Sequence, residues 1–332
     1  MRISFVEPHL KVYGGIRRIV EFANRFVDRG EDVTIYHPEG TPCDWLPCRA
    51  RILPTSQLHE SDHDVAIYNN PPDYPLVRRA RARLKVFYIL ALYDRDQLKK
   101  FNPKIFWPKK GRMMALKRSL QMPFLHVSNA TWMQRWLREN LNMETELQLG
   151  GVNHELFHPV PTVKDPDVFR ILCSGDTRAH KGTATIVKAV EIVQRKYPSV
   201  KLDTYHGKGI AQEDMAAEYG RADLFVDAQW YAGWNNPVVE SMACGVPIVC
   251  SAIGGVEDFA VHEETALHAP ARDVDAFAEA IDRLIASREL RESLVAAGLE
   301  RVKAFEWDQA ADQFLAMLYR RSGLSQESGA SR

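Results

Sequence analysis

The 332-residue sequence has no apolar run approaching the ~20 residues that a membrane-spanning helix needs. Its first residues, MRISFVEP, lack the apolar core of a signal peptide and are typical of a strand followed by a loop. The five cysteines are odd in number and irregularly spaced, which excludes the disulfide framework of a small secreted protein. We therefore expect a cytoplasmic protein.

The chain also lacks net charge, because 43 basic residues balance 43 acidic ones. Without a basic excess or a recognisable binding motif, nucleic acid is not an expected partner. The charge is uneven, however: residues 1–155 carry 24 Lys and Arg against 17 Asp and Glu. This asymmetry indicates an anionic partner for the first half of the chain.

Basic residues in that half form two clusters, at positions 78–85 and 99–112, and the second is interleaved with Phe101, Phe106 and Trp107. Such a mixture can rest on an anionic membrane leaflet at the inner face of the plasma membrane, or bind an anionic lipid-linked acceptor. A solvated basic face explains the same pattern equally well.

Two further motifs are missing. No His and Cys spacing completes a metal site, so no metal is expected. The only Gly-x-Gly, at 207–209, lacks the third glycine and the following acid of a dinucleotide-binding fingerprint. An NAD-type dehydrogenase is thereby excluded.

Strand-like and helix-like segments alternate along the chain, a pattern typical of βαβ units and parallel sheets. The expected strands are 3–7, 33–37, 65–69, 86–90, 124–127, 147–149, 169–174, 201–205, 224–227 and 248–251. The expected helices are 16–29, 132–140, 182–196, 274–286, 289–303 and 309–320, with one more after position 235.

These segments divide into two Rossmann-like domains. We expect an N-terminal domain at 1–155 and a C-terminal domain at 156–322, joined through a proline-rich hinge at 159–166. Residues 323–332 are small and polar, and we expect a disordered tail.

Two glycine-containing turns precede helices and offer backbone N–H groups to an anion. Gly14 and Gly15 follow the first strand, although a plain turn fits them equally well. The segment Arg178-Ala179-His180-Lys181-Gly182 follows a later strand. Arg178 and Lys181 are unfavourable against the positive end of a helix dipole, which favours a role in binding phosphate.

The segment from 232 to 257, AGWNNPVVESMACGVPIVCSAIGGVE, carries the most specific pattern. A turn containing Trp234, Asn235 and Asn236 leads into a helix that holds Glu240. A carboxylate at that place can accept two hydroxyl hydrogen bonds, as a ribose would offer, unless it lies on a solvated helix face.

This block resembles the C-terminal signature of family-4 retaining glycosyltransferases, also called group 1 glycosyltransferases. Their pattern runs E-G-F-G-x-P-x-x-E-A-M-A-C-G-x-P-V-V and is followed by G-G-x-x-E. Glu240 matches the second acid, and Gly255 and Glu257 match the trailing motif, either behind the donor site or as a structural turn. Ala232 replaces the first acid, which in that family faces the donor sugar.

The resemblance implies the GT-B fold, an α/β fold of two Rossmann-like domains facing each other across a cleft, whose last helix crosses back to the first domain. It implies retaining transfer of a hexose or deoxyhexose from a nucleotide-diphosphate sugar to a glycan or lipid-linked acceptor, in surface polysaccharide or glycoconjugate biosynthesis. It implies no metal and no other cofactor.

The resemblance also assigns roles. Arg178 and Lys181 stabilise the leaving diphosphate, Glu240 holds the ribose, and the turn at 234–236 contacts the donor, as do Gly14 and Gly15. That family often has a His near the end of a first-domain strand; here Asp94 is a nearby polar residue, contacting substrate or capping a helix. A catalytically degenerate protein that binds a nucleotide or glycan is the alternative, because Ala232 replaces an acid.

Overall fold

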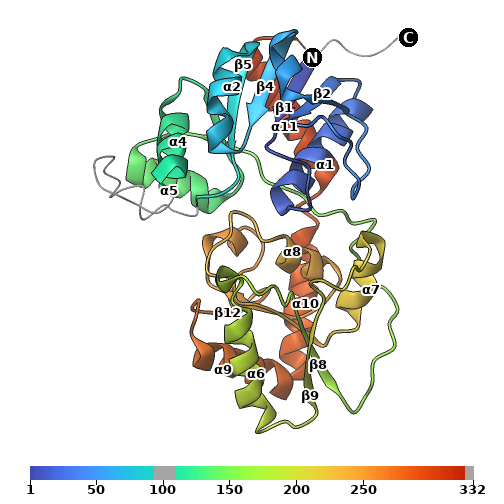
Figure 1. Ribbon diagram of the computed structural model, residues 1–332. Helices are drawn as coiled ribbons and strands as arrows, with labels where there is room; N and C mark the ends of the chain where they lie inside the picture. The colour runs from blue at the N-terminus through green and yellow to red at the C-terminus, as the bar shows by residue number, and fades with distance from the viewer. Residues whose placement is uncertain (93–109, 326–332) are drawn as a thin grey trace. The chain divides into compact units, whose positions relative to one another are not determined.

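The computed structural model describes residues 1–92 and 110–325 of the chain. Within them the chain forms two compact units, each built on a parallel sheet (Figure 1). Unit 1 comprises Met1–Gly150 and Trp307–Arg332, and unit 2 comprises Gly151–Glu306. The predicted α/β class with two Rossmann-like domains is confirmed.

Unit 1 contains a seven-stranded sheet in the order β3-β2-β1-β4-β5-β6-β7, in which every neighbouring pair is parallel. Its strands are β1 (Arg2–Val6), β2 (Asp32–His37), β3 (Arg51–Pro54), β4 (Asp62–Tyr68), β5 (Arg81–Ile89), β6 (Leu125–Ser128) and β7 (Glu146–Leu147). Its helices include α1 (Gly14–Asp28), α2 (Tyr74–Arg79), α4 (Lys110–Gln121), α5 (Thr131–Leu141) and α11 (Trp307–Ser322).

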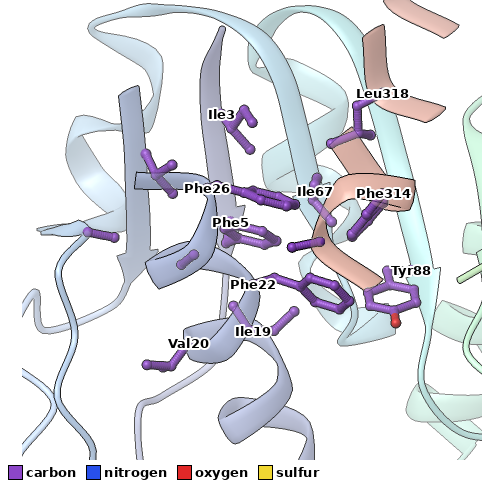
Figure 2. Close-up of a cluster of buried hydrophobic side chains, with 14 of the residues drawn as sticks. Ile3, Phe5, Ile19, Val20, Phe22, Phe26, Ile67, Tyr88, Phe314 and Leu318 are labelled. Atoms are coloured by element: carbon purple, nitrogen blue, oxygen red, sulfur yellow. The ribbon is translucent and has the colours of Figure 1, made fainter. Parts of the chain in front are cut away.

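The core of unit 1 is formed by α1 and α11 against the sheet (Figure 2). Helix α1 carries buried apolar residues every three or four positions, which gives it one apolar face. From that face Phe22 meets Phe314 of α11 edge to face, with ring centroids 5.0 Å apart. Tyr88 of β5 lies 5.4 Å from the same Phe314 ring. An aromatic cluster therefore joins the last helix to the first unit.

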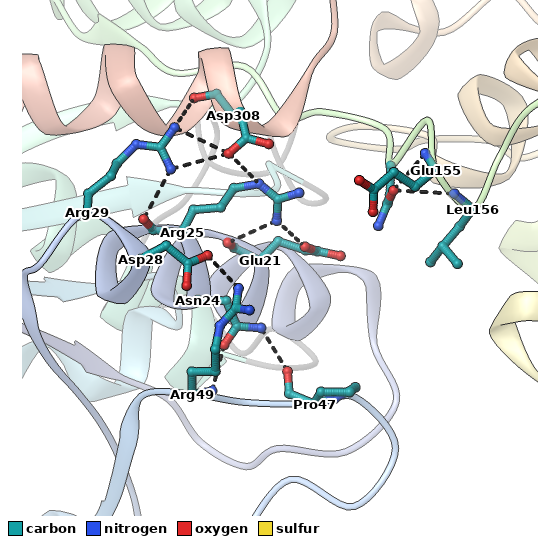
Figure 3. Close-up of polar contacts among 11 residues, drawn as sticks. Glu21, Asn24, Arg25, Asp28, Arg29, Pro47, Arg49, Glu155, Leu156 and Asp308 are labelled. Carbon is teal, nitrogen blue, oxygen red and sulfur yellow. Dashed lines mark hydrogen bonds and ion pairs between the residues drawn. The ribbon is translucent and has the colours of Figure 1, made fainter.

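Polar contacts flank this cluster (Figure 3). Arg29, which directly follows α1, donates to the Asp308 carbonyl at 3.0 Å and to the Asp312 carboxylate at 2.5 Å. Both acids are well exposed, so these ion pairs contribute little beside the aromatic packing. The expectation that the last helix returns to the first domain is confirmed. The predicted C-terminal domain, 156–322, included helix α11. In the structure the apolar face of α11 packs in the core of unit 1, and the helix belongs to that unit.

Unit 2 contains a five-stranded parallel sheet in the order β12-β11-β10-β8-β9. Its strands are β8 (Phe169–Cys173), β9 (Val200–Thr204), β10 (Leu224–Asp227), β11 (Ile248–Ser251) and β12 (Leu267–Ala269). Its helices include α6 (Thr183–Gln194), α7 (Met215–Gly220), α8 (Asn236–Ala243), α9 (Val274–Ala286) and α10 (Arg288–Val302).

Strand order places a branch point in each sheet. In unit 2 the chain leaves β8 for β9 on one side and later returns to β10 on the other. In unit 1 it leaves β1 towards β2 and β3 before returning to β4. Loops that follow the two central strands diverge at such a point, where parallel α/β sheets bind their ligands. The β8/β10 and β1/β4 edges are therefore the places to look for a site.

No helix in residues 1–92 and 110–325 combines the length and the apolar composition that crossing a membrane would require. The tail expected at 323–332 lies mostly outside the described residues.

Candidate functional site

At the branch point of unit 2, the loop after β8 and the loop after β10 are bound to each other. The Trp230 backbone N–H donates to the His180 carbonyl at 2.9 Å. Gly182 has a φ of +71° and lies so close to Ala228 that an added Cβ would stand 1.9 Å from the Ala228 carbonyl oxygen. Glycine is required there for its conformation and for its small size, so the two loops form one rigid surface.

Lys181 bridges these loops through its side chain. Its ammonium donates to the Gln229 amide oxygen at 2.8 Å. Burial lowers the pKa of Lys181; the negative charge of Asp227 opposes that shift, whereas Arg178 adds to it. The predicted phosphate-binding cation is thus held half-buried, by a neutral amide rather than by a carboxylate.

Asp227, the last residue of β10, is 4% exposed and lies behind that amide. Its carboxylate accepts from the Gln229 amide nitrogen and the Asn235 amide nitrogen at 2.9 Å each, and from the Gln229 backbone at 3.2 Å. Burial raises the pKa of Asp227, while both amides and the ammonium of Lys181 oppose the shift. Sequence analysis missed Asp227; its signal was a lone acid ending an otherwise apolar strand.

Arg178 lies in the same loop as Lys181 and is 53% exposed. Its guanidinium donates to both carboxylate oxygens of Asp176, at distances of 2.5 to 3.1 Å. These hydrogen bonds are the main reason that the pKa of Asp176 falls to about 2. Asp176 orients Arg178 next to Lys181, and an incoming phosphate would share the guanidinium with it.

Glu240 lies on α8 and is buried, so the interpretation as a solvated helix-face residue is wrong. The Tyr219 hydroxyl donates to its carboxylate at 3.3 Å. Burial, with the charges of Tyr205 and Glu240 adding to it, raises the pKa of Tyr219 well above its ordinary value. Tyr219 therefore stays protonated and fixes one oxygen of Glu240.

Asn235 and Asn236 differ in exposure. Asn235 is buried, and its side-chain amide is engaged with Asp227 and with Gln229, from which it accepts at 3.2 Å. A donor contact by Asn235 would therefore involve its backbone or a rearranged side chain. Asn236 is the half-buried first residue of α8 and remains a predicted donor contact.

The Trp234 ring packs in an aromatic cluster of unit 2. Its centroid lies 4.9 Å from that of Phe259 and 5.4 Å from that of Phe305, in edge-to-face contact with both. Phe305 comes from beyond the end of α10. These contacts give the Trp234 ring a role in the packing of unit 2. The predicted contact of Trp234 with the donor stays a prediction.

Gly255 supports the turn from behind. A Cβ added to it would stand 2.6 Å from the Ala232 carbonyl oxygen, and its own carbonyl accepts from the Asn235 backbone at 3.0 Å. Glu257, two residues later, is exposed. These contacts favour a structural role for Gly255, with Ala232 packed against it.

In unit 1, Gly14 and Gly15 open α1 after Tyr13, with no side-chain cap and no acid in the first turn. A Cβ on Gly15 would stand 3.2 Å from the Leu90 side chain, just beyond β5. The glycine turn therefore lies at the carboxyl edge of the sheet, where an anion could approach. Its predicted role in donor binding stays a prediction.

Arg18, one turn into α1, is buried rather than directed to solvent. It donates to the Tyr88 hydroxyl at 2.9 Å, and Tyr88 donates to the Gln148 carbonyl at 2.8 Å. The Gln148 amide donates in turn to the Ala310 carbonyl of α11 at 2.9 Å. This chain of hydrogen bonds joins α1, β5 and α11.

The remaining predicted site residue, Asp94, lies outside the described residues.

Glu7 follows β1 directly, at the branch point of the first sheet, and is 1% exposed. The Asn69 amide donates to one of its oxygens, and the other has no hydrogen-bond partner in the part of the chain that the structure describes. Burial, reinforced by Asp73, raises the pKa of Glu7 well above its ordinary value, although the Asn69 bond opposes the shift. Glu7 is thus a buried carboxyl that favours its protonated form.

Replacing Glu7 with glutamine is expected to stabilise the protein at neutral and alkaline pH. The unfolded chain releases the Glu7 proton above about pH 4.3, whereas the folded chain retains it to a higher pH, so folding becomes less favourable as pH rises between the two pKa values. Glu7→Gln removes that penalty. Thermal unfolding between pH 4 and pH 8 should show a gain in Tm that grows with pH. The exposed Glu39→Gln serves as control, and a gain equal at every pH would refute the interpretation.

Within the described ranges, no three or more His, Cys, Asp and Glu side chains are grouped as metal ligands. Independence from metal stays a prediction.

Comparison with known proteins bears on this geometry. Residues 203–301, which lie within unit 2 and include Asp227 and Glu240, match the family described as "Glycosyl transferases group 1". Unit 2 contains a group 1 glycosyltransferase domain.

Relatives of this domain include O-antigen chain mannosyltransferase B of Escherichia coli, 34% identical over 104 residues, which are 31% of this chain and 27% of the relative. A GDP-mannose-dependent α-(1-6)-phosphatidylinositol monomannoside mannosyltransferase of Mycobacterium tuberculosis is 31% identical over 200 residues, 48% of this chain and 52% of the relative. The chain thus spans between about a quarter and about half of these relatives.

The fold extends the likeness beyond the group 1 domain. Sucrose-phosphate synthase from Thermosynechococcus elongatus matches with a TM-score of 0.75 and 21% identity, covering 96% of this chain and 98% of its own. The Anabaena protein HepE in complex with UDP-glucose matches with a TM-score of 0.72 and 14% identity, covering 96% and 99%. Both units therefore have the fold of known glycosyltransferase structures.

Proposed function

We propose that the chain is a retaining glycosyltransferase that moves a hexose or deoxyhexose from a nucleotide-diphosphate sugar to a glycan or lipid-linked acceptor. Support comes from the match of residues 203–301 to the group 1 family and from the place of the predicted residues in unit 2, which contains that segment. Lys181 and Arg178 stand in the loop after β8, and Glu240 lies on the helix after β10. These neighbouring strands meet at the branch point of the sheet, where a nucleotide is expected.

The donor is proposed to bind through its diphosphate and its ribose. Lys181 offers a point charge and Arg178 a planar pair of donors, both suited to phosphate oxygens. Glu240, oriented by Tyr219, accepts from the ribose hydroxyls. Curated relatives named for GDP-mannose and a structural neighbour that holds UDP-glucose make GDP and UDP the first nucleotides to test.

The reaction breaks the bond between the anomeric carbon and the diphosphate oxygen, and the bonding electrons leave with the diphosphate. Lys181 and Arg178 stabilise the charge that develops there, so no metal is required. The acceptor hydroxyl attacks from the face that the diphosphate leaves and gives its proton to a phosphate oxygen. This front-face route accounts for retention without a covalent nucleophile.

Unit 1 is proposed to bind the acceptor, and its turn at Gly14 and Gly15 is proposed to contact the donor. Arg81 and Arg83 of the first basic cluster are exposed at the amino end of β5, the sheet edge opposite to the glycine turn. That cluster is therefore proposed to contact an anionic membrane surface rather than the acceptor. The second cluster, at 99–112, lies largely outside the described residues.

The observation that carries the proposal is the bonding of the Lys181 loop to the Asp227 loop, which lies within the segment that matches the group 1 family. A thermal-shift panel of GDP, UDP, ADP and their sugars tests it. One nucleoside diphosphate should raise Tm, and its sugar should release a free sugar of unchanged anomeric configuration at early times by NMR. An inverted anomer would refute retention, and a panel without any stabilisation would refute the donor site.

A non-catalytic nucleotide-binding protein is the second candidate, because Ala232 stands packed on Gly255 where the family pattern has an acid. Stabilisation by a nucleotide sugar without diphosphate release, whatever acceptor is supplied, would favour that reading.

Replacing Glu240 with glutamine is expected to weaken binding of the stabilising nucleotide about ten-fold, as the loss of a hydrogen bond to a charged group predicts. The effect should be confined to the ribose. Calorimetric titration should therefore find that the 2′,3′-dideoxy nucleotide, which lacks both ribose hydroxyls, binds wild type and Glu240→Gln equally weakly. The exposed Glu264→Gln is the control. An equal loss for the ribonucleotide and the dideoxynucleotide would refute the ribose contact.

A further inference from the structure

Behind Lys181 lies a buried cluster of three side chains, Asp227, Gln229 and Asn235, in which the direction of each hydrogen bond is fixed. An ionised carboxylate only accepts and an ammonium only donates. Gln229 stands between them, with its amide nitrogen on Asp227 at 2.9 Å and its amide oxygen on Lys181 at 2.8 Å. Rotating this amide would set NH₂ against the ammonium, so Asp227 determines which end of Gln229 faces Lys181.

Asn235 contacts both of the other side chains in this cluster. Its amide nitrogen donates to Asp227 at 2.9 Å, and its amide oxygen accepts from the Gln229 nitrogen at 3.2 Å. Both hydrogens of the Gln229 amide are thereby used, one on Asp227 and one on Asn235. The Gln229 side chain is held at two points, and its oxygen is presented to Lys181 in one orientation.

This arrangement suits a lysine that must bind a diphosphate. A carboxylate in direct contact would neutralise the ammonium, whereas a neutral amide holds one of its three N–H groups and leaves its charge for the ligand. Asp227 reaches Lys181 only through Gln229, and its negative charge offsets part of the free-energy cost of burying the Lys181 ammonium. The cluster positions the cation without competing for it.

We propose that Asp227, Gln229 and Asn235 form a buried relay that positions Lys181 for the donor diphosphate. The relay rests on the proposed function, since Lys181 must bind the diphosphate for its position to matter. None of the three contacts the reacting atoms in this account. They are positioning residues, and Asp227 acts on the ligand only through Lys181.

A double-mutant cycle on nucleotide affinity tests the relay. The probe is GDP or UDP, whichever stabilises the wild-type chain, and its Kd is measured by calorimetric titration. Asp227→Asn should weaken binding about ten-fold, within the coupling range of residues in one network. In the Lys181→Ala background the same change should have less than about a two-fold effect. Equal losses in both backgrounds would overturn the relay.

The cycle separates failure of the relay from failure of the proposed function. If Lys181→Ala leaves the Kd unchanged, the phosphate assignment fails and the relay fails with it. If Lys181→Ala weakens binding but Asp227→Asn does not, only the relay is refuted. Gln229→Met, which removes the bridging amide and keeps the length of the side chain, carries the same test if Asp227→Asn does not fold.

A matched control lies at the other end of the same strand. Asp223 precedes β10 and accepts from the Arg170 backbone at 2.8 Å and from Lys164 at 3.1 Å. Asp223→Asn therefore removes a hydrogen-bonded carboxylate from the other end of the strand, away from the Lys181 loop, and should leave the Kd unchanged. A loss equal to that of Asp227→Asn would show a general effect on the sheet and refute the relay.

The pH dependence of binding supplies a second readout. The charged groups that face Lys181 are Asp227 from β10 and Asp176 and Arg178 from its own loop. Asp227→Asn removes a negative charge, so Lys181 should lose its proton at a lower pH. Affinity should then begin to fall at a lower pH than in wild type. An unchanged pH profile, with affinity uniformly reduced, would indicate a purely structural role.

Discussion

Lys181→Ala is expected to lower donor turnover by about 10²–10³-fold, the loss typical of removing one group that stabilises charge in the transition state. Lys181 is held by Gln229 at the branch point of the second sheet. Its charge matters most when the diphosphate departs, because negative charge on the leaving oxygen is then greatest. The rate of nucleoside diphosphate release measures the effect.

The fold should survive this change, since the hydrogen bond from the Trp230 backbone to the His180 carbonyl still joins the two loops. Lys188→Ala is the matched control, because Lys188 is exposed on α6 in the same unit. Circular dichroism and Tm should be near wild type for both variants. Turnover retained by Lys181→Ala would remove the phosphate assignment.

Gly182→Ala is expected to destabilise unit 2 by about 3 kcal/mol. A left-handed backbone costs an alanine about 1–2 kcal/mol, and forcing an extra methyl into a packed contact adds about 1–3 kcal/mol. Gly182 has a φ of +71°, and its added Cβ would meet the Ala228 carbonyl oxygen at 1.9 Å. The loops carrying Lys181 and Gln229 should separate, with loss of nucleotide binding.

Gly207→Ala separates the two contributions, because Gly207 has a φ of +79° and, among residues 1–92 and 110–325, no atom lies within 4 Å of an added Cβ. Gly207→Ala should lose only the free energy that the left-handed backbone costs an alanine. Urea unfolding of both variants gives the difference in free energy of unfolding. Equal destabilisation would show that the approach of the two loops is not tight.

The fold was largely predictable because it depends on local patterns. Buried strands such as β10 and β11 are short, mainly apolar runs bounded by turns, and α1 shows helical spacing of apolar residues. The missed strand β3, RILP, lies at the sheet edge and carries an arginine and a proline. Helix α4, KGRMMALKRSLQ, was not predicted: its polar residues outnumber its apolar ones, and its first three residues belong to the basic cluster at 99–112.

The candidate site was predictable where one segment carries the signal. Arg178 and Lys181 stand close together against a helix dipole, and Glu240 interrupts an apolar helix. Contacts between distant segments were not predictable. The role proposed for Asp227 depends on Lys181, which lies 46 positions earlier and is brought to Gln229 by the pairing of β8 with β10.

Other residues took different partners for the same reason. Trp234 packs on Phe305, which is supplied from beyond the end of α10. Asn235 is drawn inward by Asp227, and Arg18 by Tyr88 of β5. In each case a polar or aromatic residue near a turn was available for a ligand by sequence, and a segment far along the chain supplied the partner.

Release of nucleoside diphosphate from GDP-mannose and UDP-glucose, measured with the wild-type chain and Lys181→Ala side by side, tests the central claim most directly. We expect release from one donor by the wild type, and at least a hundred-fold slower release by the variant. Release at equal rates by both proteins would contradict the claim that the loops after β8 and β10 form the diphosphate site. No release from either donor, despite binding of its nucleotide, would contradict the claim that the chain is a glycosyltransferase for these donors.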